Sequence, residues 1–197
     1  MILAARARPA VFLNGLSLAR MVAVPIVMAL LLGGRDSGPA YAVAAAVFAL
    51  AAATDFLDGY LARNWGASSK LGSFLDTTAD KLLVTGPLFA LVAVDRVSAW
   101  IAFVIVGREL LVLGLRGVVA AEGAVFPPSI WGKLKANVQF LAIFLAIGRW
   151  GDPLGPLFLD ELAMLAAAAI TVASGVEYLV HYASALKPER GPGARRE

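Results

Sequence analysis

Apolar segments long enough to cross a lipid bilayer fill most of this chain. A spanning helix needs about 20 predominantly apolar residues. The chain is 60% hydrophobic and its mean hydropathy is +0.79, which is far above soluble usage. Six spans are predicted, and the fifth, which is short, is expected to extend back toward Trp131. Their ranges are 13–32, 40–61, 71–94, 99–120, 136–148 and 157–182. The sequence therefore predicts an all-α integral membrane protein with six transmembrane helices.

The two ends of the chain differ from this pattern. Residues 1–9 carry Arg6 and Arg8 among apolar residues, and they are expected to form either an interfacial helix on the membrane surface or a frayed tail. Residues 187–197 are basic and rich in proline and glycine, a composition typical of disorder. We therefore expect one transmembrane domain over residues 1–186, followed by a disordered tail.

Composition also excludes several kinds of site. The chain has no cysteine, which rules out disulfides and thiolate metal ligands. Its only histidine, His181, cannot build a zinc site alone. No internal repeat is visible, which disfavours the transporter folds that are built from repeats.

Basic residues are distributed unevenly between the two sides of the predicted bundle. With six spans, the side that holds both termini carries ten Lys and Arg residues, against three on the opposite side. Loops rich in Lys and Arg remain in the cytoplasm, so both termini are expected there, in a cell (inner) membrane. Four basic residues remain inside the predicted spans and need a specific reason. They are Arg20, Lys81, Arg108 and Arg116.

Four aspartates and an arginine occur where the second predicted span ends and the third begins. At about 100° per residue, Asp55, Asp58 and Arg63 share an arc of roughly 140°, and Asp76 and Asp80 lie within an arc of roughly 80° on the next helix. If these helices form a hairpin, the four carboxylates converge. So much negative charge in a low-dielectric site requires cations, and hard divalent cations suit oxygen ligands.

The position of the aspartates along the helix favours access from the cytoplasm. Asp55 lies about 12 Å along the helix axis from Arg63, near headgroup depth on the cytoplasmic side. A lipid-linked substrate and a water-soluble one could both reach it there. The alternative is that the acids form buried salt bridges in a structural bundle or a proton or ion relay in a transporter.

The motif resembles the signature of the CDP-alcohol phosphatidyltransferases. It reads Asp-x2-Asp-Gly-x2-Ala-Arg-x8-Gly-x3-Asp-x3-Asp from Asp55 to Asp80 and matches at all eight fixed positions. The resemblance implies two metal ions, Mg²⁺ or Mn²⁺, bound by Asp55, Asp58, Asp76 and Asp80. It also implies that Asp80 acts as the general base, a role that spacing alone cannot separate from that of a ligand.

The resemblance further implies residues that bind the CDP-lipid. Gly59, Arg63 and Ser69 match positions that contact the nucleotide, although Arg63 could also be a positive-inside anchor and Ser69 an ordinary loop residue. Upstream, Asn14-Gly-Leu-Ser17-Leu-Ala-Arg20 resembles the opening of the family branch that uses glycerol 3-phosphate. Asn14 and Ser17 could instead cap the first helix. We expect Arg20 to lie near the nucleotide or the diphosphate.

Glycerol 3-phosphate, the acceptor in that family branch, carries a phosphate that needs fixed cations. The candidates are Arg116, Lys133 and Lys135. They end the fourth span and open the fifth across a short loop. Arg116 lies two turns from Glu109, however, so a buried ion pair between these two is the structural alternative.

The expected function follows from this resemblance. The chain would transfer the phosphatidyl group from CDP-diacylglycerol to glycerol 3-phosphate, giving phosphatidylglycerophosphate and CMP, by metal-assisted direct displacement. Alternatives are the same chemistry with inositol phosphate or serine as acceptor, or, from another class, a carboxylate-based ion or proton transporter. Membrane lipids and a second copy in a homodimer are the expected partners, and no nucleic acid is expected.

Overall fold

The computed structural model describes residues 2–34, 38–65, 70–121, 130–149 and 157–185, and over these residues the chain forms six helices. They are α1 (Ile2–Gly33), α2 (Gly38–Trp65), α3 (Lys70–Ala93), α4 (Ala99–Ala121), α5 (Ile130–Gly148) and α6 (Leu159–Ala185). Each helix covers one predicted span. The fifth begins at Ile130, which confirms its extension past Trp131.

The N-terminal segment forms no separate element. Helix α1 runs without a break from Ile2 to Gly33 and contains Pro9 and Pro25. The stretch expected to be an interfacial helix or a frayed tail is therefore helical and continuous with the first span. The tail over residues 187–197 lies outside the described part of the chain.

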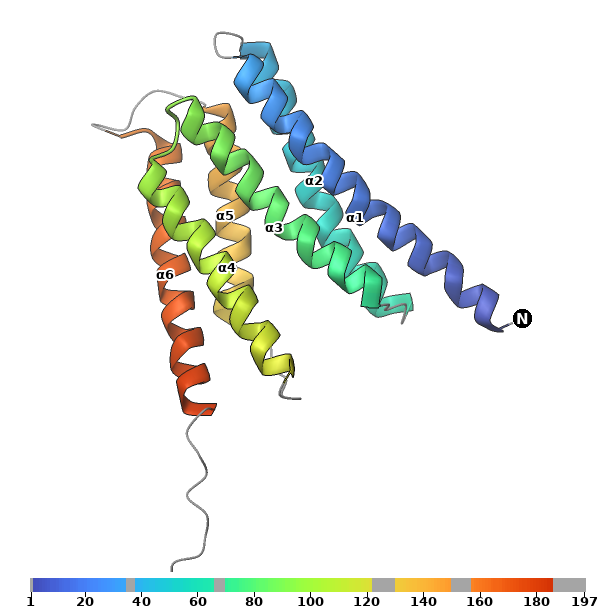
Figure 1. Cartoon of the computed structure of the whole chain (residues 1–197). Coiled ribbons are helices and arrows are strands. Elements are labelled where there is room, and N and C mark those ends of the chain that lie inside the picture. Colours follow the sequence, from blue (N-terminus) through green and yellow to red (C-terminus); the bar gives the residue numbers. More distant parts are fainter. Residues whose placement is uncertain (1, 35–37, 66–69, 122–129, 150–156, 186–197) are drawn as a thin grey trace, which may run out of the picture.

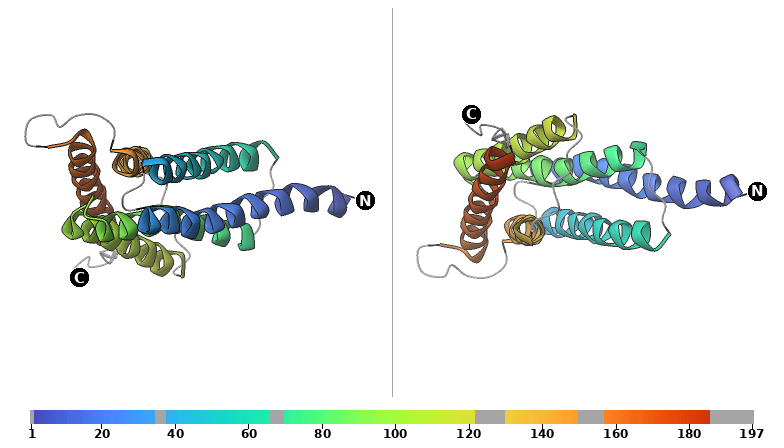
Figure 2. Two further views of the ribbon diagram at one scale, coloured as in Figure 1. Left: turned by 90° about the horizontal axis from the view of Figure 1, so that it is seen from above. Right: turned by 90° about the horizontal axis from the view of Figure 1, so that it is seen from below.

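Successive helices alternate in direction, so the start of α1 and the end of α6 lie at the same end of the bundle (Figure 1). Helix α1 packs on α2 and α3, while α6 packs on α4 and α5. Helix α3 joins these two groups because it also contacts α4 and α5. Viewed along the bundle (Figure 2), α5 lies beside the start of α2. Helix α3 thus has contacts with both groups, and it carries half of the aspartate motif.

A continuous apolar core holds the helices together. It includes Val27, Phe48, Leu83, Leu88 and Ile143, each at most 1% exposed. Between membrane helices such side chains stabilise the bundle through van der Waals packing, because lipid tails are as apolar as the side chains themselves. The apolar groups therefore fix the bundle, and charged groups are placed within that frame.

Helices α1 and α3 are tightly packed at Gly86. A Cβ atom at this position would clash with Cγ1 of Val24 and would lie 3.2 Å from Sδ of Met28. Glycine removes that obstacle, as small residues commonly do between membrane helices. The close approach brings the polar half of α3 against α1.

The outer surface of the bundle is apolar, as expected for contact with lipid. Phe103 is 69% exposed and Leu50 is also 69% exposed. Within the described residues, three segments are long and apolar enough to cross a membrane, namely Val11–Gly33, Gly38–Asp58 and Leu159–Tyr182, and Leu134–Gly148 is a shorter apolar segment. The chain is thus an all-α membrane protein. Crossing by α3 and α4, which carry several charges, and by α5, whose apolar segment is short, stays a prediction.

Arginines also stabilise the end of the bundle away from the aspartate motif. Arg96 donates hydrogen bonds to the carbonyls of Ala146 and Ile147 at the end of α5 (3.2 and 2.7 Å). Arg149 pairs with Asp160 of α6 at 3.2 Å and with Glu161 at 3.4 Å. These contacts satisfy carbonyl groups at a helix end and link helices, so their role is structural.

Candidate active site

The aspartate motif folds as the helical spacing predicts. Asp55 and Asp58 lie on α2, and Asp76 and Asp80 lie on the first half of α3. One carboxylate oxygen from each of Asp55, Asp76 and Asp80 lies within 4.8 Å of the others. The hairpin of α2 and α3 therefore brings these three carboxylates together, and Asp58 joins them through a shared partner.

That shared partner is Arg20 of α1, whose side chain is 1% exposed. Its guanidinium donates hydrogen bonds to Asp58 and Asp76 at 2.7 Å and to Asp80 at 2.8 Å, and it also bonds Asp55. We call these five residues the acidic cluster. Four carboxylates against one guanidinium leave an excess of three negative charges.

The acidic cluster has the donor set that a hard divalent cation requires. Its ligands would all be carboxylate oxygens, which Mg²⁺ and Mn²⁺ prefer. Oδ1 of Asp58 is buried and has no hydrogen-bond partner among the described residues, so the cluster retains coordinating capacity. The excess negative charge also favours added cations, most strongly at the buried Asp58, where uncompensated charge is costly. The residues therefore fit a divalent metal site.

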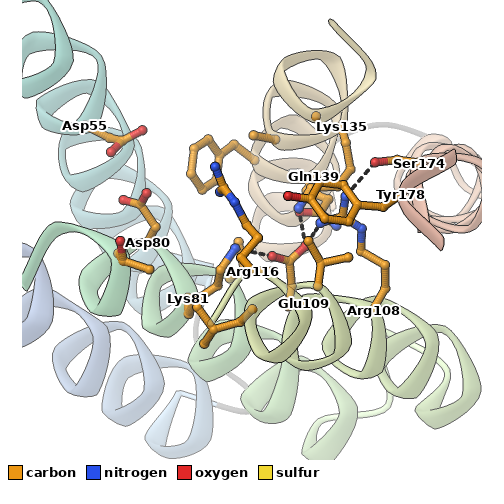
Figure 3. A pocket seen from close by; sticks show the side chains of 17 residues that line it. Asp55, Asp80, Lys81, Arg108, Glu109, Arg116, Lys135, Gln139, Ser174 and Tyr178 are labelled. Carbon is orange, nitrogen blue, oxygen red and sulfur yellow. Dashed lines mark hydrogen bonds and ion pairs between the residues drawn. The ribbon is translucent and has the colours of Figure 1, made fainter. Parts of the chain in front are cut away.

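A second charged cluster lies one residue further along α3 and has the opposite composition (Figure 3). Glu109 of α4 is 2% exposed and bonds both Lys81 of α3 and Lys135 of α5. Arg108 lies 3.6 Å from Glu109 and donates a hydrogen bond to Oγ of Ser174 on α6 at 2.6 Å. We call Lys81, Arg108, Glu109 and Lys135 the basic cluster. Three cations against one carboxylate leave an excess of two positive charges.

The partners of Glu109 differ from the structural alternative considered for the sequence. Glu109 is buried as expected, but among the described residues its ion pairs are with Lys81, Arg108 and Lys135 rather than with Arg116. Arg116 is exposed and lines the pocket next to this cluster. It is therefore placed to meet a ligand, which the proposed pair with Glu109 would have prevented.

One cavity connects the two clusters. It has a volume of about 330 Å³ and is lined by Asp55 and Asp80 of the acidic cluster and by the whole basic cluster. This volume lies at the lower end of the range for small-molecule sites. Because Asp80 and Lys81 are neighbours on α3, the acidic and basic walls of the cavity are directly adjacent. A molecule in it can face acidic and basic side chains together.

The other predicted CDP-lipid residues lie on α1, on α2 and after α2. Ser17 is buried inside α1 and hydrogen bonds the carbonyl of Leu13 at 3.4 Å, and Asn14 lies one turn earlier. Neither caps the helix, because α1 begins at Ile2, so that alternative is wrong. Gly59 and Arg63 lie on α2, but the side chain of Arg63 is outside the described set.

Two further predicted residues, Ser69 and Lys133, have side chains outside the described set. Ser69 lies outside the described residues. Lys133 lies on α5 one turn from the start of the helix, and its side chain is outside the described set. Lys135, two residues later, is 5% exposed and takes part in the basic cluster.

Lys81, Arg108 and Gln139 line the cavity but were not among the predicted site residues. For Lys81 and Arg108 the signal was present, because both are charged residues inside predicted spans. All four such residues lie at this site: Arg20 in the acidic cluster, Lys81 and Arg108 in the basic cluster, and Arg116 on the cavity wall. The requirement that an intramembrane charge have a partner was therefore the usable signal.

The fold and the site define a class of protein: a helical membrane protein with an acidic cluster that fits a divalent cation, beside a pocket with an excess of basic side chains. Comparison with known sequences specifies the family. The chain belongs to the CDP-alcohol phosphatidyltransferase family, whose sequence model matches residues 11–173. The chain is therefore a phosphatidyltransferase, an enzyme of phospholipid synthesis.

Individual relatives cover most of the chain. It is 42% identical over 180 residues to the probable phosphatidylglycerophosphate synthase of Mycobacterium tuberculosis, covering 90% of this chain and 84% of that protein. It is 37% identical over 185 residues to the CDP-diacylglycerol--glycerol-3-phosphate 3-phosphatidyltransferase of Bacillus subtilis, covering 88% and 96%. A protein of the same name from Rickettsia typhi is 35% identical over 169 residues, covering 84% and 93%.

Proposed function

We propose that the chain transfers the phosphatidyl group of CDP-diacylglycerol to glycerol 3-phosphate and so forms phosphatidylglycerophosphate and CMP. The relatives whose names specify this reaction support the proposal. The structural observation that carries it is the single cavity lined by both charged clusters. This reaction needs a centre for a diphosphate and its metal ions beside a centre for a phosphorylated acceptor.

The acidic cluster is the proposed metal and diphosphate side of the site. Asp55, Asp58, Asp76 and Asp80 would hold two divalent cations, Mg²⁺ or Mn²⁺, and such ions neutralise the charge on the transferring phosphoryl group. Arg20 contacts all four carboxylates. Its position supports a role near the diphosphate. The remaining proposed CDP-lipid contacts are Asn14, Ser17, Gly59, Arg63 and Ser69.

The basic cluster is the proposed acceptor side. Lys135 and Arg116 line the cavity as the proposal requires, together with Lys81 and Arg108, and Lys133 is assigned here on its position in α5. Arginine binds phosphate through two parallel hydrogen bonds, whereas lysine acts as a point charge. The surplus of cations over Glu109 leaves positive charge for the phosphate of the acceptor.

Asp80 is the proposed general base. It lines the cavity and directly precedes Lys81. An acceptor whose phosphate is held by the cations would therefore place its reacting hydroxyl near this carboxylate. The hydroxyl oxygen would form a bond to the phosphorus that carries diacylglycerol, while the bond from that phosphorus to CMP breaks. Asp80 would take the hydroxyl proton, and CMP would leave with the bonding electron pair. No covalent enzyme intermediate is needed.

The proposed location is the cell (inner) membrane, with both termini and the active site on the cytoplasmic side. The ten-to-three distribution of basic residues supports this orientation. The chain has no cysteine, so single cysteines can report topology. A cysteine replacing Gly191 should react with an impermeant thiol reagent only after the membrane is opened, and one replacing Ser37 should react before.

A homodimer is proposed as the assembly.

An acceptor comparison tests the proposed function. The purified protein would be incubated with CDP-diacylglycerol, Mg²⁺ or Mn²⁺, and glycerol 3-phosphate, inositol phosphate or serine, and CMP and lipid products would be separated. We expect phosphatidylglycerophosphate and CMP with glycerol 3-phosphate. Turnover only with inositol phosphate or serine would show that this compound, and not glycerol 3-phosphate, is the acceptor. If no CMP were released with any of the three acceptors, the transporter alternative would be favoured.

A further inference from the structure

Gln139 is a buried polar residue whose hydrogen bonds are incomplete. It lies on α5, is 1% exposed and lines the cavity (Figure 3). Its Nε2 donates a hydrogen bond to Oγ1 of Thr171 on α6 at 2.8 Å. Its Oε1 is buried and has no hydrogen-bond partner within the described ranges. The amide is therefore fixed at one end and has unused hydrogen-bonding capacity at the other.

An unpaired amide end in the interior is unfavourable, so it points to a ligand or to an ordered solvent molecule. The assignment of oxygen and nitrogen in an amide depends on the hydrogen-bond network. If Oε1 instead faced Thr171, Nε2 would be the unpaired group. A ligand hydroxyl satisfies either orientation, because it can donate and accept.

Arg108 supplies a second incomplete group in the same cavity. Its Nε is buried and without a hydrogen-bond partner among the described residues, although its terminal nitrogens contact Ser174 and Glu109. An N–H on a guanidinium calls for an acceptor atom, and a phosphate oxygen is the strongest available. The unpaired groups of Arg108 and Gln139 together complement a molecule with an anionic oxygen and a hydroxyl.

We infer that Gln139 selects the acceptor by hydrogen bonding to the hydroxyl that does not react, an assignment that rests on the proposed function. The reacting hydroxyl must face Asp80 on α3, whereas Gln139 enters the cavity from α5, across from Asp55 and Asp80 (Figure 3). The phosphate belongs with the cations that line the cavity, because they offer it charge-assisted hydrogen bonds that a neutral amide does not. In glycerol 3-phosphate the group left for Gln139 is the 2-hydroxyl.

Two acceptors that differ only in this hydroxyl test the inference. 3-Hydroxypropyl phosphate keeps the phosphate and the reacting hydroxyl of glycerol 3-phosphate and lacks the 2-hydroxyl. With the wild-type enzyme, kcat/KM should be about 10- to 100-fold higher for glycerol 3-phosphate, the range expected for loss of a hydrogen bond to a buried group. In Gln139→Met, which keeps the side-chain length without the amide, the two values should agree within about threefold.

Thr171→Val is the matched control, because it removes the other end of the same interhelical hydrogen bond and leaves the amide of Gln139 in place. It should retain the wild-type preference between the two acceptors. A structural role for Gln139 predicts instead that both variants lose activity equally with both acceptors, which would overturn the inference. Should Gln139→Met not fold, Gln139→Asn withdraws the amide by one methylene and should also lower the preference.

The wild-type measurement can also overturn the inference by itself. Equal kcat/KM for the two acceptors would show that no group recognises the 2-hydroxyl, while phosphatidylglycerophosphate formation would still support the proposed function. Absence of turnover with glycerol 3-phosphate, with turnover of another acceptor, would refute the proposed acceptor and the role of Gln139 with it. The two failures are thus distinguishable.

Discussion

The acidic and basic clusters are built on the same plan with the charges exchanged. In the acidic cluster one buried guanidinium, that of Arg20, bonds four carboxylates. In the basic cluster one buried carboxylate, that of Glu109, has three cationic neighbours. Each central group links helices, and its single charge does not balance the opposite charges around it. The difference shows that one bundle can hold excess charge of both signs when each excess has a counter-charge at its centre.

The contacts between Arg149 and its acids show what a purely structural arrangement looks like. Arg149 pairs with Asp160 and Glu161 at the far end of the bundle, where a cavity is lined by the acids Asp95 and Glu161 and by the cation Arg96. At the active site, Asp80 and Lys81 bring the two excess charges next to each other. In the proposed function, each of these opposite surpluses is matched to a ligand.

The largest effect should come from removing a carboxylate of the acidic cluster. Asp58→Asn keeps the shape of the side chain but removes its charge, so turnover should fall by about a thousandfold or more, equivalent to about 4 kcal/mol. Chelation should silence the wild-type enzyme, and Mg²⁺ or Mn²⁺ should restore it. The assay is CMP release from CDP-diacylglycerol.

Glu161→Gln is the control for this loss of charge, since Glu161 pairs with Arg149 at the other end of the bundle. It should keep near wild-type turnover. Undiminished activity in Asp58→Asn would contradict the metal role of the acidic cluster.

The next effect concerns stability and should be similar for the two central groups. Glu109→Gln leaves Lys135 buried opposite a neutral side chain, and Arg20→Gln leaves four carboxylates without their shared cation. Removing one partner of a buried ion pair typically costs 3–5 kcal/mol. Thermal unfolding in detergent should therefore show both variants well below the wild type. Arg116→Ala, at an exposed position, should unfold near the wild-type temperature, and equal stability of all three variants would refute the central roles.

The smallest effect separates the two substrates. Arg116→Ala removes an exposed cation from the acceptor wall, so KM for glycerol 3-phosphate should rise about tenfold, while KM for CDP-diacylglycerol stays near its wild-type value. Initial rates at varied concentrations of each substrate measure this. A folded variant with an unchanged KM for glycerol 3-phosphate would place the acceptor phosphate elsewhere in the cavity.

Sequence alone predicted the helices and the convergence of the aspartates better than it predicted which charged residues pair with each other. Hydrophobic segments predicted the six helices because burial in lipid or in the core determines each one. The spacing of Asp55 to Asp80 predicted the convergence of carboxylates because helical periodicity fixes a shared face. The partner of Glu109 was missed, since Arg116 is near in sequence whereas Lys81 and Lys135 come from α3 and α5. Only the packing of three helices brings these residues together.

The extent of α1 was missed for a related reason. Arg6, Arg8 and Pro9 suggested a break before the first span, yet the helix continues through them from Ile2. Pro9 is the eighth residue of this helix and removes one backbone hydrogen bond, without ending the helix. The capping roles considered for Asn14 and Ser17 depended on that break and fail with it.

The central claim is that the two clusters bind ligands of opposite charge, and a crossed thermal-shift measurement tests it most directly. The wild type, Arg20→Gln and Glu109→Gln would be unfolded in detergent with Mn²⁺ alone or with inorganic phosphate alone. We predict that Mn²⁺ raises the unfolding temperature most in Arg20→Gln, where it replaces the missing cation. Phosphate should raise it most in Glu109→Gln, where it replaces the missing anion. Equal responses of the two variants to both ligands, or the reverse pattern, would contradict the account.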